Sequence, residues 1–156
     1  MAALIRHGDE LLLVEHRKEG RRYHLLPGGG LAAGETLAEA LVREVREECG
    51  LTVSVGAPLF LSDSVAPDGS RHVVNIVFGA DVLGPAAPAR DPRVAGCRWV
   101  SVENLGAVRL HPPMASAITD GWADGFSGPA RYLGALWADD EKAMAPADED
   151  AGAATT

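Results

Sequence analysis

Short apolar segments separated by turns open the chain. Residues 2–5 and 11–14 each have the length and composition of a strand, and the polar stretch between them predicts a turn, so we expect an opening hairpin. A charged loop over residues 17–22 follows. Residues 23–26 predict another strand, which leads directly into a turn with three successive glycines.

The apolar pattern changes from a strand period to a helical period after this turn. Thr36 followed by Glu39 has the spacing of a capping box, which predicts the start of a helix. The apolar positions at helical spacing behind it are Leu37, Leu41 and Val45. Gly50 suits the left-handed position that follows a helix, so we predict that this helix ends near Cys49.

Extended segments and turns alternate in the second half of the chain. Strands are predicted at residues 52–55, 59–61, 73–78 and 97–100, a loop at 84–92, a short helical turn at 101–105 and a closing helix at 113–122. Pro58 separates the first two of these strands, and Asp68 with Gly69 is a turn signal that joins the middle strands into a long hairpin. Strands interleaved with two substantial helices predict an α/β fold, an α/β/α sandwich around a mixed β-sheet.

The end of the chain divides into an apolar and an acidic part. The apolar residues are Tyr132, Leu133, Leu136 and Trp137. They are apolar enough to pack either onto the body of the protein or onto a partner subunit, so a homodimer is left open. Residues 139–156 combine low hydrophobicity with an acidic excess, which predicts a disordered tail behind a single domain at residues 1–138.

The charge and hydropathy of the chain limit its partners. Its 156 residues carry a formal net charge of −8, which argues against nucleic acid as a partner because phosphate backbones attract basic surfaces. No segment approaches the roughly 20 apolar residues that span a bilayer, so no membrane partner is expected. We predict a soluble, cytoplasmic protein that binds small anions locally, through a metal ion and a few arginines.

The two cysteines, Cys49 and Cys97, fall in the predicted helix and in a predicted strand. Neither has a CxxC partner, and free cysteine is among the residue types most often buried. We therefore predict that both are reduced core residues in a reducing compartment, without a redox or zinc role.

Three glutamates gather on one side of the predicted helix. Glu44, Glu47 and Glu48 stand at i, i+3 and i+4, so their carboxylates project in one direction beside the apolar face. Clustered carboxylates are hard oxygen ligands, for which Mg²⁺ is the usual occupant and Mn²⁺ a substitute. Taken alone, the run also fits a solvated face in which Arg43 and Arg46 neutralise the glutamates.

The glycine turn and the helix together match a known motif at every defined position. The order is Gly29, five residues, Glu35, seven residues, Arg43-Glu44-Val45, one residue, Glu47-Glu48, one residue, Gly50-Leu51. This is the Nudix box, and the chain therefore resembles Nudix hydrolases. The resemblance extends to the flanking strand pattern, the downstream Arg98-Trp99-Val100 and the overall size, and it implies the same α/β/α sandwich.

The resemblance implies roles for individual residues. Glu44, Glu47 and Glu48 would hold the metal ions, with one of them taking the proton of the attacking water, and the carbonyl of Gly28 would join them. The candidate substrate-binding residues are Arg17, His24, Gly29 and Gly30. His24 stands where family members often have tryptophan, and both a ligand contact and a structural role under the loop are open.

Two further positions of the family pattern concern architecture. Glu35 and Arg43 would form a structural pair that pins the loop to the helix, because an arginine fork matches a carboxylate. Many relatives carry another carboxylate about six residues before the tryptophan that corresponds to Trp99, and here that position is Arg93. Asp91, two residues earlier, is a candidate substitute.

The implied reaction is Mg²⁺-dependent hydrolysis of a diphosphate bond in a nucleoside diphosphate linked to another moiety. ADP-ribose or a similar derivative is the first candidate, with a nucleoside monophosphate as product. Hydrolysis of nucleoside triphosphates or oxidised nucleotides is the alternative, and a nucleotide-sensing module without hydrolysis is a third. Pro67 lies one residue from a proline typical of ADP-ribose pyrophosphatases, but it also suits the turn before Asp68. Phe60, Phe78 and Trp122 are candidates to stack on a base or to fill the core.

Overall fold

A computed structural model describes residues 1–18, 20–86 and 91–137 of the chain. The strands are β1 (Ala2–His7), β2 (Glu10–Lys18), β3 (Arg21–Leu25), β4 (Leu51–Val65), β5 (His72–Pro85), β6 (Val94–Ser101) and β7 (Arg131–Ala135). The helices are α1 (Leu37–Cys49), α2 (Ala115–Ala123) and the 3₁₀ helix η1 (Val102–Ala107). The predicted tail at 139–156 lies outside the described residues, and its disorder stays a prediction.

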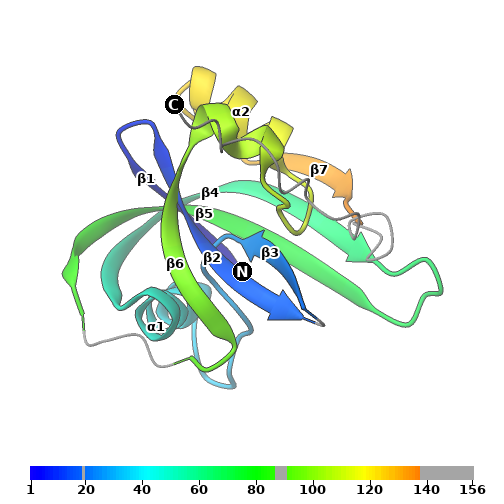
Figure 1. Cartoon of the computed structure of the whole chain (residues 1–156), viewed down its shortest axis with the longest axis horizontal. Helices are drawn as coiled ribbons and strands as arrows, with labels where there is room; N and C mark the ends of the chain where they lie inside the picture. The colour runs from blue at the N-terminus through cyan, green and yellow to red at the C-terminus, as the bar shows by residue number, and fades with distance from the viewer. Residues whose placement is uncertain (19, 87–90, 138–156) are drawn as a thin grey trace, which may run out of the picture.

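The strands form one mixed sheet in the order β3-β2-β1-β5-β4-β7, with β6 added along β2. The opening hairpin is confirmed, since β1 and β2 are antiparallel and pair Arg6 with Leu11. Two pairs are parallel, β1 with β5 and β4 with β7. Figure 1 shows β6 descending across the front of this sheet towards α1.

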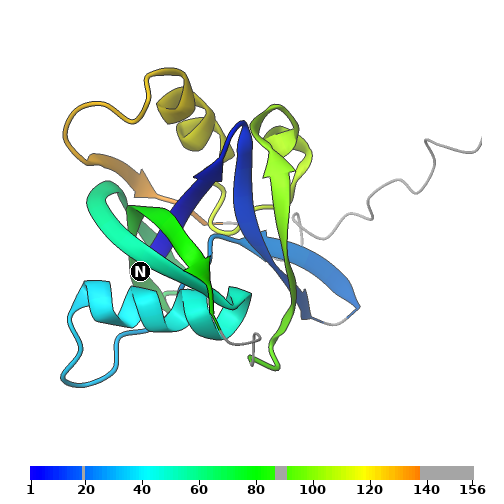
Figure 2. The same ribbon diagram turned by 90° about the vertical axis from the view of Figure 1, so that its left-hand side faces the viewer.

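The two α-helices cover opposite faces of the sheet, as Figure 2 shows with α1 below and α2 above the strands. The alternation of side chains along β2 explains this arrangement. Leu12 packs in a core cluster with Leu41 and Val45 of α1, whereas Leu11 and Leu13 pack in the cluster that contains Ile118 of α2. A run of leucines in a strand thus feeds two cores at once, and the predicted α/β/α sandwich is confirmed.

The long hairpin of β4 and β5 is also confirmed, but its strands are longer than predicted. The turn forms where Gly69 N donates to Ala66 O at 2.8 Å, which places Pro67 in the turn. Residues 51–65 make one continuous strand because the pairing with β5 shifts register on both sides of Pro58. A bulge of this kind absorbs a residue that has no N–H to donate. The predicted loop at 84–92 begins later, since β5 continues to Pro85.

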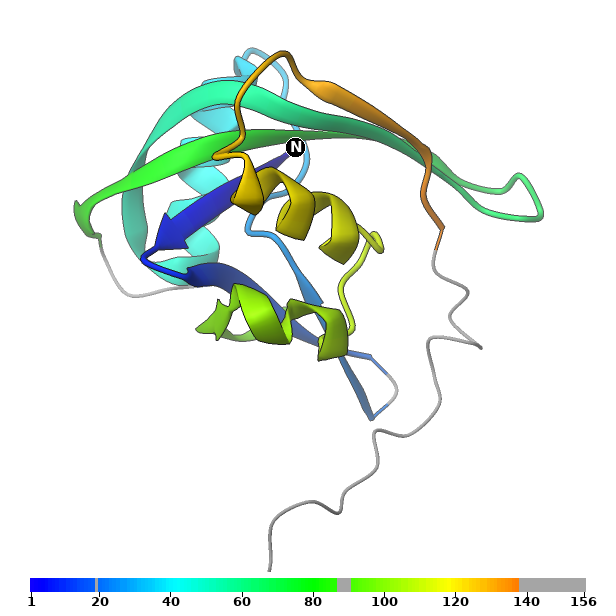
Figure 3. The same ribbon diagram turned by 90° about the horizontal axis from the view of Figure 1, so that it is seen from above.

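The apolar residues near the end of the described chain divide into two packed and two exposed side chains. Strand β7 lies parallel to β4 and pairs Tyr132 with Leu61, and Figure 3 shows the two strands side by side. Leu133 and Leu136 pack against the core cluster on the α2 side. Tyr132 is 68% and Trp137 is 37% exposed, so a contact of these two with a partner subunit stays a prediction.

The prediction of two reduced cysteines is wrong. Cys49 and Cys97 form a disulfide, with their Cα atoms 5.6 Å apart. Cys97 pairs with Val14 in the β2–β6 ladder, and the half-buried Cys97 packs in the cluster under α1. The long-range strand pairing therefore brings it to the end of the helix. Within the described part of the chain, no helix is long and apolar enough to cross a membrane.

Candidate active site

Helix α1 begins and ends where the sequence predicts. Thr36 Oγ1 accepts a hydrogen bond from Glu39 N at 3.3 Å, and Glu39 Oε2 accepts one from Thr36 N at 2.8 Å, so the capping box is complete. At the other end Gly50 has a φ of 65° and donates its N–H to Arg46 O at 3.1 Å. These caps fix the first and last turns, and with them the direction in which the glutamates project.

The three glutamates differ sharply in burial. Glu44 is 6% exposed and Glu48 is 5% exposed, whereas the side chain of Glu47 is 48% exposed. A fully solvated salt-bridged face is therefore wrong for Glu44 and Glu48, which lie beside Val45 on the core side of the helix. Buried carboxylates are uncommon and need compensation from donors or cations.

Arg43 is the centre of the hydrogen bonds around Glu44. Its Nε and Nη2 donate to the two oxygens of Glu35 at 2.7 and 3.0 Å, and Nη2 also donates to Gly30 O at 3.2 Å. Its Nη1 donates to Glu44 Oε1 at 2.9 Å and to Glu47 Oε2 at 3.4 Å. The bond from Arg43 lowers the pKa of Glu35, and the carboxylates raise the pKa of Arg43. One guanidinium thus joins the loop to the helix.

The glycines of the turn bring backbone into contact with the buried carboxylates. A Cβ on Gly29 would overlap the carboxylate of Glu44, and a Cβ on Gly28 would overlap the backbone of Met1. The Gly28 φ of 152° also lies outside the range that side chains favour. Gly29 N donates to Met1 O at 3.0 Å, so the turn is held against β1 as well as against α1.

Glu48 is the buried carboxylate with the most perturbed acidity. Its Oε2 accepts a hydrogen bond from Gly28 N at 2.8 Å. Burial raises the pKa of Glu48 to about 7, and the charges of Glu44 and Asp91 add to this against the opposing hydrogen bond from Gly28. The metal-free site therefore holds more negative charge than its surroundings stabilise.

A divalent cation suits this donor set in chemistry and charge. Carboxylate oxygens are the ligands that Mg²⁺ and Mn²⁺ prefer, and a nearby cation would favour the ionised form of Glu48. Within the described ranges, no three His, Cys, Asp or Glu side chains already converge on one point. Glu44 Oε1 is turned to Arg43 and Glu48 Oε2 to Gly28, so binding a metal would require these side chains to reorient.

Arg17 and His24 gather around Glu15 of β2. Arg17 Nε donates to Glu15 Oε1 at 3.2 Å, and His24 Nε2 lies 3.9 Å from Glu15 Oε2. His24 is 8% exposed, its pKa is lowered mainly by burial, and neither ring nitrogen has a hydrogen-bond partner within the described structure. The structure thus brings these two candidates together with each other, at Glu15.

Asp91 and Arg93 form a pair that the sequence did not indicate. Asp91 N donates to Glu47 O at 3.2 Å, which places Asp91 against the last turn of α1. Its carboxylate accepts from Arg93 Nε at 3.0 and 3.1 Å and from Nη2 at 2.5 Å. Arg93 lowers the pKa of Asp91 to about 2. Asp91 therefore lies near the glutamates, as a substitute carboxylate would, but its oxygens are engaged by a guanidinium.

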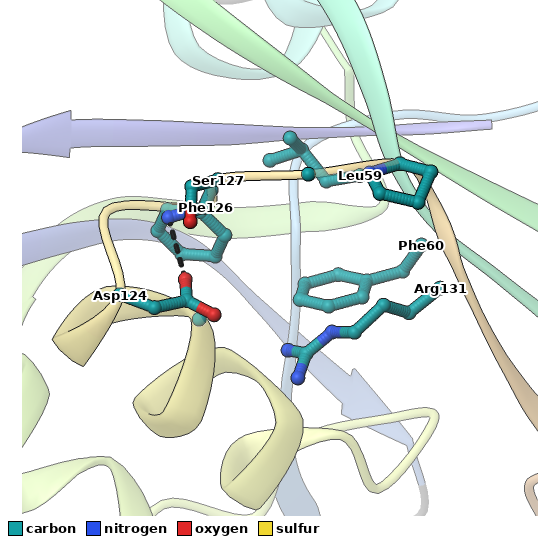
Figure 4. A pocket seen from close by; sticks show the side chains of 9 residues that line it. Leu59, Phe60, Asp124, Phe126, Ser127 and Arg131 are labelled. Carbon is teal, nitrogen blue, oxygen red and sulfur yellow. Dashed lines mark hydrogen bonds between the residues drawn. The ribbon is translucent and has the colours of Figure 1, made fainter.

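A small pocket between α2, β4 and β7 is lined by Phe60, Phe126 and Arg131, among others (Figure 4). Phe60 is 1% exposed. Its ring meets Phe126 edge to face at 6.0 Å and lies 5.0 Å from the Arg131 guanidinium. Asp124 accepts a hydrogen bond from Phe126 N at 2.8 Å, which closes the loop around the pocket. Of the aromatics that sequence offered for base stacking, Phe60 is a core residue.

Comparison with protein families gives a match over most of the chain. A model of the NUDIX domain matches residues 1–120. An ADP-ribose pyrophosphatase of Methanocaldococcus jannaschii is 37% identical over 89 residues, which cover 56% of this chain and 53% of that protein. This chain thus aligns with about half the length of that relative. The phosphatase NudJ of Escherichia coli is 28% identical over 137 residues, or 86% of this chain and 88% of that protein.

Solved structures show the same fold. A NUDIX hydrolase from Nitrosomonas europaea superimposes with a TM-score of 0.72 at 22% identity, over 82% of this chain and 89% of that one.

Proposed function

This chain belongs to the NUDIX domain family and is a Nudix-type hydrolase, and from that premise we propose that it cleaves the diphosphate bond of a nucleoside diphosphate linked to another moiety. ADP-ribose is the substrate we favour, with a nucleoside monophosphate as one product. The observation that carries the proposal is that the carboxylates of Glu44 and Glu48 are buried and contact the glycine turn. The pyrophosphatase relative supports the choice of substrate.

Nudix hydrolases use divalent metal ions, and we propose Mg²⁺ here, with Mn²⁺ as a substitute. Glu44, Glu47 and Glu48 would hold it, together with the carbonyl of Gly28. When held by these residues, the ion would supply charge neutralisation of the phosphates and activation of a water for attack on phosphorus. Two observations support this ligand set: the raised pKa of Glu48, and the 2.8 Å hydrogen bond from Gly28 N to Glu48 Oε2, which holds the glycine turn against α1.

Arg43 acts in this proposal as a positioning residue. Its fork to Glu35 and its bond to Gly30 O hold the turn at a fixed distance from the helix, while its bond to Glu44 neutralises part of the cluster. Gly29 contributes by having no side chain, which lets the turn approach Glu44. The Glu35–Arg43 pair would therefore support the geometry of the site without touching the reacting atoms.

The substrate side of the site is assigned to backbone and to β2–β3. Backbone N–H groups of glycine-rich turns bind phosphate oxygens, which suits Gly29 and Gly30. Arg17 is exposed and offers a cation to a phosphate or ribose. His24 is buried, and neither of its ring nitrogens has a partner within the described structure; a polar group of the substrate would satisfy them if the loop above His24 opens.

Product analysis separates the candidate reactions. The purified protein is incubated with ADP-ribose, other nucleoside diphosphate derivatives and nucleoside triphosphates in Mg²⁺, and the products are resolved as monophosphates, inorganic phosphate or pyrophosphate. We expect AMP and ribose 5-phosphate from ADP-ribose, and no turnover in excess EDTA. If the protein releases pyrophosphate from triphosphates and leaves ADP-ribose intact, its substrate is a nucleoside triphosphate and not ADP-ribose. Full turnover in EDTA would show that the reaction needs no divalent metal ion.

A further inference from the structure

A guanidinium shares the electrostatic surroundings of the buried glutamates. Arg93 lies immediately before β6, which begins at Val94. Asp91 is the main cause that raises the pKa of Arg93, and the charges of Glu44 and Glu48 add to it. Arg93 and Asp91 in turn both act on Glu48. The candidate active site therefore includes a cation from a part of the chain outside the Nudix box.

Three connections hold this segment beside the end of α1. Asp91 N donates to Glu47 O at 3.2 Å, Val94 pairs with His16 at the start of the β2–β6 ladder, and Cys97 is bonded to Cys49. Figures 1 and 2 both show the beginning of β6 next to α1. The place of Arg93 is thus set by the fold, and not by the reach of a flexible side chain alone.

Burial differs strongly within the Asp91–Arg93 pair. The side chain of Asp91 is 6% exposed and that of Arg93 is 73% exposed. Asp91 also accepts a hydrogen bond from Arg93 N at 2.9 Å. The bonds to the carboxylate use Nε and Nη2, so Nη1 lies on the side of the guanidinium away from Asp91. The pair has a buried anchor and an exposed cation.

We propose that Arg93, positioned by Asp91, binds a phosphoryl group of the substrate beside the glutamate cluster. The proposal rests on the function above, because a diphosphate is the ligand it supplies. Asp91 holds the guanidinium by Nε and Nη2, so the exposed edge that carries Nη1 is the one that can donate to phosphate oxygens. Arginine stays charged at any working pH, which suits it to bind a phosphoryl group.

The need for such a cation follows from the charge of the protein. The chain carries a formal net charge of −8, and three glutamates lie on α1 beside the glycine turn, so a diphosphate meets repulsion on approach. Arg93 offsets part of it at the point of contact. Asp91 is then a positioning residue, because its carboxylate oxygens hold the guanidinium of Arg93.

Four variants test the assignment. Arg93→Ala removes the cation, Arg93→Lys keeps the charge without the fork, and Asp91→Asn releases the anchor. Arg71→Ala is the matched control, because Arg71 is an exposed arginine beside the tip of the β4–β5 hairpin. Each is assayed for kcat and KM on the substrate that wild type hydrolyses, for half-activation by Mg²⁺, and for binding of inorganic pyrophosphate by calorimetry in Mg²⁺.

Arg93→Ala should raise KM and weaken pyrophosphate binding by roughly tenfold to a hundredfold, the range for a lost charge-assisted bond. Half-activation by Mg²⁺ should change far less than KM, because Arg93 acts on Glu48 through its charge and is not a proposed ligand of the metal. Arg93→Lys should recover part of the loss, Asp91→Asn should lie between Arg93→Ala and wild type, and Arg71→Ala should match wild type.

Two results would overturn the assignment while leaving the proposed function intact. One is an active Arg93→Ala enzyme with unchanged KM and pyrophosphate affinity. The other is a large rise in the Mg²⁺ requirement of Asp91→Asn with none in Arg93→Ala, which would make Asp91 a metal ligand. If wild type hydrolyses none of the nucleotides, the proposed function fails. The role of Arg93 is then tested by pyrophosphate binding alone. A wild-type protein that does not bind pyrophosphate would overturn the proposed phosphate site.

Discussion

Replacing Glu48 by glutamine should stabilise the metal-free protein, although it removes a residue of the proposed active site. Glutamine keeps the size of the side chain and an oxygen that accepts from Gly28 N, the partner of Glu48 Oε2 at 2.8 Å. It removes the buried charge. The gain should depend on pH, because the substituted group titrates in wild type and not in the variant.

The sign and magnitude follow from the acidity of Glu48. Burial raises its pKa from 4.5 to about 7, so the folded state binds its proton more tightly than the unfolded state does. The contribution of Glu48 to the free energy of unfolding is therefore fully present below pH 4.5 and is lost as pH rises to about 7. At 1.36 kcal/mol per pKa unit the loss is at most about 3 kcal/mol above pH 7.

Thermal melting in EDTA at pH 4.5 and at pH 8 measures this difference. At pH 8 Glu48→Gln should melt above wild type by up to roughly 6–12 °C, taking about 2–4 °C per kcal/mol for a domain of this size. At pH 4.5 the two should melt together. Glu47→Gln is the control on the same helix, since the side chain of Glu47 is half exposed, and it should shift little at either pH.

In Mg²⁺ the Glu48→Gln variant should be less active than wild type, although it is the more stable of the two proteins in EDTA at pH 8. Turnover of Glu48→Gln should fall by on the order of 10²-fold or more, the scale of lost base catalysis or charge stabilisation. If Glu48→Gln is destabilised equally at both pH values, the burial of an ionised Glu48 does not destabilise the folded protein, and the reasoning is refuted. A variant that keeps its turnover per folded molecule would show that Glu48 is structural.

Two other changes probe the connections of α1. Arg43→Ala should cost roughly 2–3 kcal/mol, because it leaves the buried Glu44 Oε1 without its donor and removes the fork from Glu35, which keeps the bond from Ala32 N; urea unfolding checks this, with exposed Arg46→Ala as control, and equal stability of the two variants would contradict it. Reduction of the disulfide should cost up to about 4 kcal/mol, since Cys49 and Cys97 close a loop of 48 residues. Melting with and without a dithiol measures this, and the Cys49→Ser/Cys97→Ser double variant should not respond; a wild type that melts identically in both conditions would contradict the crosslink.

Local signals predicted the parts of the molecule that are built from neighbouring residues. The limits of α1 follow from Thr36, Glu39 and Gly50, whose capping interactions lie within a few residues of one another. The Arg43–Glu35 pair followed from the match to a family motif, and the structure confirms it as a hydrogen-bonded fork.

Features that depend on distant pairing were not accessible in the same way. The disulfide was missed because Cys97 reaches α1 only through the register of β6 on β2. The unequal burial of Glu44 and Glu47 depends on where the glycine turn lies, since Gly29 lies directly against the Glu44 carboxylate while the Glu47 side chain is half exposed. The residue type of Asp91 made it a candidate metal ligand. Only the positions of both side chains show that the guanidinium of Arg93 binds its carboxylate.

Helix α1 is anchored to two different parts of the protein, and this bears on how the molecule moves. At its midpoint the helix is tied to the glycine turn through Arg43, and at its last residue it is bonded to β6 through Cys49. Amide protons in the middle of such a helix should exchange with solvent only when the whole domain opens. Adaptation to different nucleotides would then come from parts of the chain outside α1, around a helix that stays in place.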